Sequence, residues 1–139
     1  MSPEMSSIGS TPHDRRYTIL VSDDDPGVRR GLQLLLRSRG YTVSGYTSGS
    51  ALLADPRAKN ADCVILDYRM PDIDGFAILR HLRQSGWSGR AIMISGFHDL
   101  VLARRAAEAG FDHVISKPVI GRAILDAVGQ HSAQSRRKH

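Results

Sequence analysis

The sequence is poor in the features that mark secreted or membrane proteins. It has one cysteine, 6% aromatic residues and no apolar run of the roughly 18–20 residues that a bilayer-spanning helix needs. The N-terminal segment also lacks the apolar stretch of a signal peptide. Cys63 lies within the apolar run 63–66, which favours a buried thiol over a redox or metal-binding role. We therefore expect a cytoplasmic protein that does not associate with membranes.

The net charge of +5 is concentrated near the C-terminus, where Arg136, Arg137 and Lys138 supply three positive charges. The charges of residues 1–16 cancel, which leaves +2 for residues 17–130. A basic tail can contact nucleic acid phosphates loosely, but a solvated tail is the more common case. No helix-turn-helix pattern follows the last predicted helix, so we expect no sequence-specific nucleic acid binding.

Three segments are predicted along the chain. Residues 1–16 are rich in Ser, Pro and Gly and are expected to be a disordered lead, residues 17–131 one domain, and residues 132–139 a basic tail. Within the domain, short apolar runs that predict strands lie at 17–21, 41–43, 62–66, 91–94 and 113–115. Helical spacing follows each run, at 28–36, 51–53, 76–82, 100–107 and 120–128.

This alternation predicts an α/β fold in which a parallel sheet is covered by helices on both faces. The nearly continuous apolar character of 64–66 and 92–94 is typical of central strands that are buried on both sides. In such folds the functional site lies outside the carboxyl ends of the strands, at the switch point in strand order. The residues that follow each strand are therefore the candidates for function.

Polar side chains follow four of the five predicted strands: Asp23, Asp24 and Asp25 after the first, Asp67 after the third, Ser95 after the fourth and Lys117 after the fifth. Asp25 has an ordinary structural explanation, because Asp followed by Pro26 is a good N-cap for a helix. The other carboxylates would repel one another if they were brought together without a cation.

The gathered residue types match metal-assisted phosphoryl transfer. Carboxylates are the hard oxygen ligands that Mg²⁺ prefers, and a carboxylate can also accept a phosphoryl group covalently. A metal ion and Lys117 would offset the charge of the transferring group, and Ser95 could donate a hydrogen bond to one of its oxygens. We interpret Asp67, at the end of a buried strand, as the phosphoryl acceptor.

At these positions the chain resembles the receiver domain of bacterial two-component response regulators, over about residues 16–131. Four motifs carry the resemblance: Ile19 to Pro26, Leu66 to Gly75, Ile94-Ser95-Gly96 and Ser116-Lys117-Pro118. The resemblance implies a CheY-like, flavodoxin-like (βα)5 fold, a three-layer sandwich with strand order 2-1-3-4-5. Residues 95–99 also resemble the corresponding loop of nitrogen-fixation and nitrogen-control regulators.

The resemblance implies a metal site and a small set of reacting groups. Asp24 and Asp67 would bind Mg²⁺ directly, Asp23 would act through water, and the main-chain carbonyl of Arg69 would supply a further ligand; Mn²⁺ could replace Mg²⁺. Asp67 would take its phosphoryl group from a phosphohistidine of a sensor histidine kinase or a phosphotransfer protein. The chain would thus be a phosphoacceptor switch, assisting its own phosphorylation and dephosphorylation, rather than an enzyme.

The resemblance also implies how the switch would operate. Lys117 would pair with Asp67 at rest and with the phosphoryl group afterwards, Ser95 would swing toward that group, and the Lys117–Pro118 peptide would be cis. The output contact, either an unknown protein or a second copy of the chain, would use the face of the fourth helix, fifth strand and fifth helix, here Leu100 to Ala109, His113 to Ile115 and Ile120 to Val128.

Three positions depart from the family pattern. Val114 stands where a rotating Tyr or Phe is usual, which leaves the coupling to output open. Arg69 places a long cation two residues after Asp67, and we expect it to alter the lifetime of the phosphorylated state. Ser22 replaces the usual apolar residue before the acidic cluster, with no predicted consequence.

Several alternatives remain open from the sequence. A haloacid-dehalogenase-like phosphatase is disfavoured, because its second Asp, two residues after the nucleophile, is replaced by Arg69. A receiver-like binding module with weak or no phosphorylation-dependent output, and the isolated receiver of a truncated transcription regulator, are the other readings. The six histidines show no ligand pair within one element, so they are interpreted as scattered surface residues.

Overall fold

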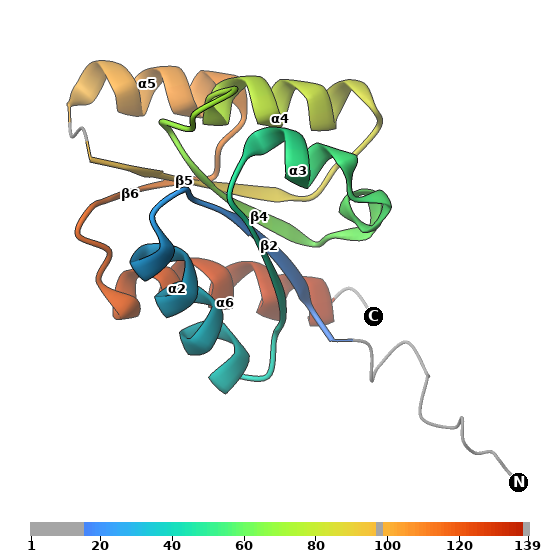
Figure 1. The fold of residues 1–139 in the computed structure, drawn as a ribbon. Coiled ribbons are helices and arrows are strands. Elements are labelled where there is room, and N and C mark those ends of the chain that lie inside the picture. The colour runs from blue at the N-terminus through green and yellow to red at the C-terminus, as the bar shows by residue number, and fades with distance from the viewer. Residues whose placement is uncertain (1–15, 97–98, 138–139) are drawn as a thin grey trace, which may run out of the picture.

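A five-stranded parallel sheet forms the middle layer of the structure, a computed structural model that describes residues 16–96 and 99–137 (Figure 1). The elements follow one another as β2 (Thr18–Ser22), α2 (Pro26–Ser38), β3 (Thr42–Tyr46), α3 (Gly49–Ala54), the 3₁₀ helix η2 (Pro56–Asn60), β4 (Cys63–Asp67), α4 (Gly75–Gln84), β5 (Arg90–Ser95), α5 (Leu100–Ala109), β6 (His113–Ser116) and α6 (Gly121–Arg137). All five predicted strands and all five predicted helices are present.

The strand order is β3-β2-β4-β5-β6, which is 2-1-3-4-5 when the described strands are counted along the chain. The flavodoxin-like topology is therefore confirmed. The order reverses between β2 and β4, and these two strands pair directly, with Ser22 opposite Leu66. Residues that leave the carboxyl ends of β2 and β4 consequently meet at the switch point, where ligands bind in such sheets.

Helices cover both faces of the sheet (Figure 1). On one face α2 and α6 pack against the sheet through a buried apolar set that includes Leu36, Ile65, Ile92, Ile124 and Val128. On the other face α3, α4 and α5 bury a second set that includes Leu52, Leu66, Ile78, Met93 and Ala106. The middle strands β4 and β5 are buried on both sides, which explains their nearly continuous apolar sequence.

Cys63 is a structural thiol, as predicted. It is fully buried in β4 and forms no disulfide. Burial raises the pKa of this thiol well above its usual range, and the nearby carboxylates of Asp112 and Asp62 raise it further. A thiol of this kind is a poor nucleophile and a poor metal ligand.

Aspartates begin the helices that border the sheet's carboxyl edge. Asp25 caps α2, Asp74 caps α4 and Asp99 caps α5, each accepting hydrogen bonds from backbone N–H groups of the first turn. At the other end of α5, Gly110 has φ of +104°, the left-handed conformation that glycine adopts without strain. The predicted N-cap at Asp25 is thus confirmed.

Two features of the structure were not predicted. The 3₁₀ helix η2 follows α3 and is capped by Asp55 with Pro56 at its first position. Helix α6 continues to Arg137, so residues 132–137 of the predicted basic tail are helical. In the parts of the chain that the structure describes, no helix is both long and apolar enough to cross a membrane.

Candidate functional site

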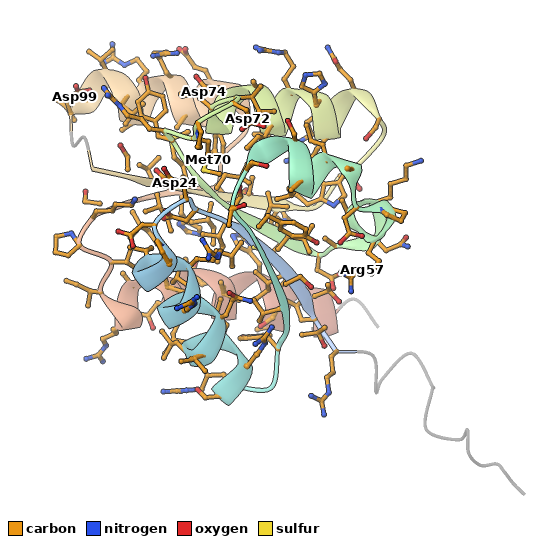
Figure 2. The ribbon with its side chains drawn as sticks, viewed as in Figure 1. Asp24, Arg57, Met70, Asp72, Asp74 and Asp99 are labelled. Atoms are coloured by element: carbon orange, nitrogen blue, oxygen red, sulfur yellow. The ribbon has the colours of Figure 1, made fainter. Side chains whose placement is uncertain are left out.

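Three aspartates meet at the carboxyl edge of the sheet. Asp67 is the last residue of β4, and Asp23 and Asp24 follow β2, its neighbour. One carboxylate oxygen from each lies within 4.8 Å of the other two. Figure 2 shows Asp24 in the loop after β2, in the region where Met70 emerges from the loop after β4. The pairing of β2 with β4 therefore brings together carboxylates that are about 43 residues apart in the sequence.

Asp23 is the most buried of the three, with no exposed side-chain surface. Its Oδ1 accepts a hydrogen bond from the backbone N–H of Asp25 at 2.9 Å. Among the described residues its Oδ2 has no hydrogen-bond donor, although Lys117 Nζ lies 3.3 Å away as an ion pair. Burial raises the pKa of Asp23 to about 6, and the charge of Asp67 adds to that rise, against the opposing Asp25 N–H and Lys117.

Lys117 joins two of the carboxylates. Its Nζ donates a hydrogen bond to Asp67 Oδ2 at 2.8 Å and lies 3.3 Å from Asp23 Oδ2. Burial works to lower the pKa of Lys117, but the hydrogen bond and charge of Asp67 and the charge of Asp23 outweigh it, so the pKa is raised. The Lys117–Pro118 peptide is cis, as expected from the sequence. The ammonium is therefore held in its charged form between its two partners.

The loop after β4 wraps closely around Asp67. The backbone N–H of Arg69 donates to Asp67 Oδ1 at 3.2 Å, and the N–H of Gly75 donates to the carbonyl of Tyr68 at 3.0 Å. A Cβ atom on Gly75 would lie 3.0 Å from the main-chain oxygen of Asp67, which is tighter than almost all real contacts. Glycine at this position lets α4 begin directly against the strand end.

A cleft of about 460 Å³ opens above the carboxylates. Its lining consists of Asp24, Asp67, Arg69, Ser95, Gly96 and Lys117. All of the predicted site residues line it except Asp23, which lies beneath, and Ser95 comes to it from the end of β5. The guanidinium of Arg69 lies 5.9 Å from the centre of the Tyr68 ring. The structure thus brings the predicted side chains from four strand ends to one opening.

The donors in this cleft fit a hard divalent cation. Three carboxylates offer oxygen ligands, one of them on an exposed side chain, Asp24, and the buried Oδ2 of Asp23 still has acceptor capacity. Magnesium binds through one or two carboxylates and several waters. Burial, and to a smaller extent the charge of Asp67, raises the pKa of Asp23, and a cation at this site would favour its ionised form.

Asp72 and Asp74 belong to the motif that follows Asp67, but their sequence context predicted no role for either. Asp72 accepts hydrogen bonds from the backbone N–H groups of Gly49 and Ser50 and from the Ser50 hydroxyl, so it ties this loop to the start of α3 (Figure 2). These donors hold the pKa of Asp72 well below its usual range. Asp74 accepts from the N–H of Ala77 at 2.9 Å and starts α4.

The structure shows the surroundings of two residues that depart from the family pattern, Ser22 and Val114. Ser22 is fully buried, and its hydroxyl lies 3.9 Å from Met70 Sδ, so it contacts the loop after β4. Val114 is half-buried in β6 and packs against the layer formed by α3, α4 and α5. It fills part of that layer with an aliphatic side chain and has no ring that could rotate.

Comparison with known proteins agrees with this geometry. The sequence model of the response regulator receiver domain matches residues 19–129. The chain belongs to the response regulator receiver family. The strand order is therefore that of a receiver domain.

Individual relatives of this receiver are known response regulators. It is 36% identical to the response regulator protein TodT of Pseudomonas putida over 115 residues, which cover 83% of this chain and 51% of TodT. It is 33% identical to the transcriptional regulatory protein FixJ of Rhizobium meliloti over 117 residues, 84% of this chain and 57% of FixJ. The receiver thus spans about half the length of these relatives.

Solved structures show the same fold. A CheY-like receiver domain protein from Methanospirillum hungatei JF-1 is 25% identical, with a TM-score of 0.78 over 89% of this chain and 98% of that one. A response regulator described as putative, from Chloroflexus aurantiacus J-10-fl, is 28% identical, with a TM-score of 0.78 over 86% of this chain and 99% of that one.

Proposed function

We propose that Asp67 accepts a phosphoryl group from a phosphohistidine of a sensor histidine kinase or a phosphotransfer protein. The observation that carries this proposal is the meeting of Asp67 with two further carboxylates and one ammonium at the switch point of the sheet. Asp67 is nearly buried, but it lines the cleft, so a donor can reach it from one side only. This approach suits an in-line displacement at phosphorus.

The transfer exchanges one bond for another. A carboxylate oxygen of Asp67 attacks phosphorus, the P–N bond to the donor imidazole breaks, and the imidazole keeps the bonding electrons. The product is an acyl phosphate on Asp67. Mg²⁺ would be held directly by Asp24 and Asp67, through water by Asp23, and by the main-chain carbonyl of Arg69, with Mn²⁺ as a substitute. When bound, it supplies charge neutralisation to the phosphoryl oxygens.

Two side chains would convert this event into a structural change. Lys117 now donates to Asp67 Oδ2, and it is placed to donate to a phosphoryl oxygen instead once that carboxylate is phosphorylated. Ser95 ends β5 at the same cleft and precedes the loop that leads to α5. A hydrogen bond from its hydroxyl to the phosphoryl group would draw this loop toward the site.

The output surface would be the face of α5, β6 and α6. Leu100 and Val101 at the start of α5 are 81% and 66% exposed, which is unusual for large apolar side chains on a helix that also contributes to the core. A second copy of the chain or an output protein would cover them. Because the match covers only 51% of TodT and 57% of FixJ, we also propose that this chain acts as the receiver part of a cytoplasmic signalling protein.

The test uses beryllofluoride, which stands in for the phosphoryl group on a carboxylate. With Mg²⁺ it should bind the wild type and raise its melting temperature, and acetyl phosphate should add the mass of one phosphoryl group. Asp67→Asn should lose both effects. Asp126→Asn, an exposed aspartate on α6, is the matched control and should keep both.

Size-exclusion chromatography with light scattering on the same samples would show whether the occupied state dimerises. If the wild type binds no beryllofluoride with Mg²⁺, the phosphoacceptor proposal is wrong, and the chain is a receiver-like binding module. If it binds beryllofluoride and neither its oligomeric state nor the NMR resonances of α5 residues change, the output proposal fails while the phosphoacceptor role stands.

A further inference from the structure

Two histidines that are far apart in the sequence meet on the side of the sheet covered by α6. His113 is the first residue of β6 and His131 lies in α6; both are half-buried. Their Nε2 atoms are 3.2 Å apart, and their ring centres are 5.1 Å apart with a tilt of 54°. The interpretation of the histidines as scattered surface residues is wrong for these two.

Of the other four histidines, the structure describes one. His81 is exposed on α4, which covers the opposite face of the sheet. His13, His98 and His139 lie outside the described residues.

The two histidines are positioned by β6 and by α6. Side chains of a strand alternate between its faces, so His113 lies on the same face of β6 as Ile115, which packs against the α2 and α6 layer. On α6 the buried residues Ile124, Ala127 and Val128 form a stripe, and His131 continues it four residues after Ala127. The two imidazoles therefore face each other from a strand at the sheet edge and from the helix that covers it.

We propose that His113 and His131 form a two-histidine site for a transition-metal ion of the Zn²⁺ or Cu²⁺ class. Zinc binds imidazole nitrogens at about 2.0–2.1 Å, so two such ligands at tetrahedral positions are roughly 3.3 Å apart. The observed 3.2 Å between the Nε2 atoms is close to this separation. The ion would lie beside the line that joins the two Nε2 atoms, about 2 Å from each, and would replace the hydrogen bond that they now share; each imidazole would then carry its proton on Nδ1.

The chemistry of this site differs from that of the aspartate cleft. Neutral imidazoles favour Zn²⁺, Cu²⁺ and Ni²⁺, whereas Mg²⁺ prefers oxygen ligands. Both side chains retain some solvent exposure, so an ion can enter and water can complete its coordination. The pair and the cleft should therefore bind different metals independently.

Binding would link the edge strand β6 to α6. Without the metal, these elements are held together by apolar contacts of Ile115, Ile124 and Val128 and by the hydrogen bond between the imidazoles. A metal bridge would add a connection inside the proposed output face. Its occupancy would restrict any rearrangement that moves β6 against α6.

The experiment is a titration of the tag-free chain with Zn²⁺ by calorimetry, in millimolar Mg²⁺ so that the aspartates are saturated. One equivalent should bind to the wild type. His113→Asn and His131→Asn should each weaken this binding at least tenfold, and His81→Asn, the matched control on α4, should leave it unchanged. Circular dichroism and beryllofluoride binding verify that each variant is folded and that the aspartate site is intact.

A second measurement needs no variant. In long-range ¹H–¹⁵N spectra of the wild type, Zn²⁺ should shift the Nε2 signals of two histidines together, and the electron paramagnetic resonance spectrum with one equivalent of Cu²⁺ should show coupling to two imidazole nitrogens. Equal Zn²⁺ affinity in the wild type and in either folded variant, or spectra without a pair of bound Nε2 atoms, would overturn the proposal and leave a structural hydrogen bond.

Discussion

Asp23→Asn should stabilise the metal-free protein. Asp23 is fully buried, and its ionised form is disfavoured by burial and by the charge of Asp67, which raises its pKa from 3.8 to about 6. Asparagine has nearly the same shape and retains the oxygen that accepts from the Asp25 N–H at 2.9 Å. Lys117 also keeps its stronger partner, Asp67, at 2.8 Å. The substitution therefore removes an unfavourable charge, and it also places an amide NH₂ where Oδ2 now lies, 3.3 Å from Lys117 Nζ, which offsets part of the gain.

The size of the effect follows from the pKa. Each pKa unit corresponds to about 1.4 kcal/mol, so the ionised carboxylate of Asp23 costs the fold on the order of 3 kcal/mol at neutral pH. We expect Asp23→Asn to raise the free energy of unfolding by about 2–3 kcal/mol at pH 7.5 without Mg²⁺. For a domain of this size, that change moves the urea midpoint upward by roughly 1–2 M.

The dependence on pH provides the second half of the test. In the wild type, the folded state binds the Asp23 proton more tightly than the unfolded state does, because its pKa is raised. The cost is fully present above about pH 6 and disappears as the pH falls toward 3.8. Lowering the pH from 7.5 to 5 should therefore close roughly half of the gap in stability between the wild type and Asp23→Asn.

Urea unfolding followed by circular dichroism measures both quantities, with Asp126→Asn as a control for the loss of one exposed negative charge. Mg²⁺ should stabilise the wild type more than Asp23→Asn, because the ion offsets the same charge. If Asp23→Asn has the same midpoint as the wild type or a lower one at pH 7.5 without Mg²⁺, the buried carboxylate is not a source of instability and this reasoning fails.

Two further substitutions test the role of Arg69 in the cleft and the packing around Gly89. Arg69→Ala should shorten the half-life of the phosphorylated state, because it removes a cation from the cleft. An exposed ion pair contributes at most about 1 kcal/mol, so the half-life should change by about fivefold or less. An unchanged half-life in a dephosphorylation assay would contradict the role assigned to Arg69. Gly89→Ala should destabilise the fold by about 1–3 kcal/mol, because a Cβ there would collide with the buried Trp87 ring and lie 2.8 Å from the carbonyl oxygen of Asp62. Gly31→Ala, on the surface of α2, is its matched control, because the new Cβ would meet no atom within 4 Å outside the neighbouring backbone of its own helix. It should stabilise the fold by about 0.5–1 kcal/mol, and similar urea midpoints for the two variants would refute the packing argument.

The fold was largely predictable because its signals are local. Apolar runs such as 63–66 and 91–94 indicate buried strands by their own composition. The Asp25-Pro26 pair likewise indicates the start of a helix by its own backbone geometry. Alternation of strands and helices leaves few arrangements other than a parallel sheet with two helical layers. The η2 turn was missed because its signal, a capping Asp before a Pro, is the same as that of an ordinary loop.

The candidate site was predictable for a related reason. In a parallel sheet every strand ends at the same edge, so residues that directly follow strands converge wherever the strands lie in the sequence. This is why Asp23, Asp24, Asp67, Ser95 and Lys117 can be grouped from their positions after the strands alone. The raised pKa of Asp23 could not be predicted, because it depends on complete burial and on the position of Asp67.

By itself, the sequence determined the strands, the helices and the set of polar residues at the strand ends, since each depends on spacing along the chain. Only the tertiary structure decided contacts between elements. It placed Lys117 between two carboxylates, joined Asp72 to the start of α3, and brought His113 and His131 within 3.2 Å of each other. Such pairs depend on how a helix is rotated and shifted on the sheet, and no periodicity within one element records that.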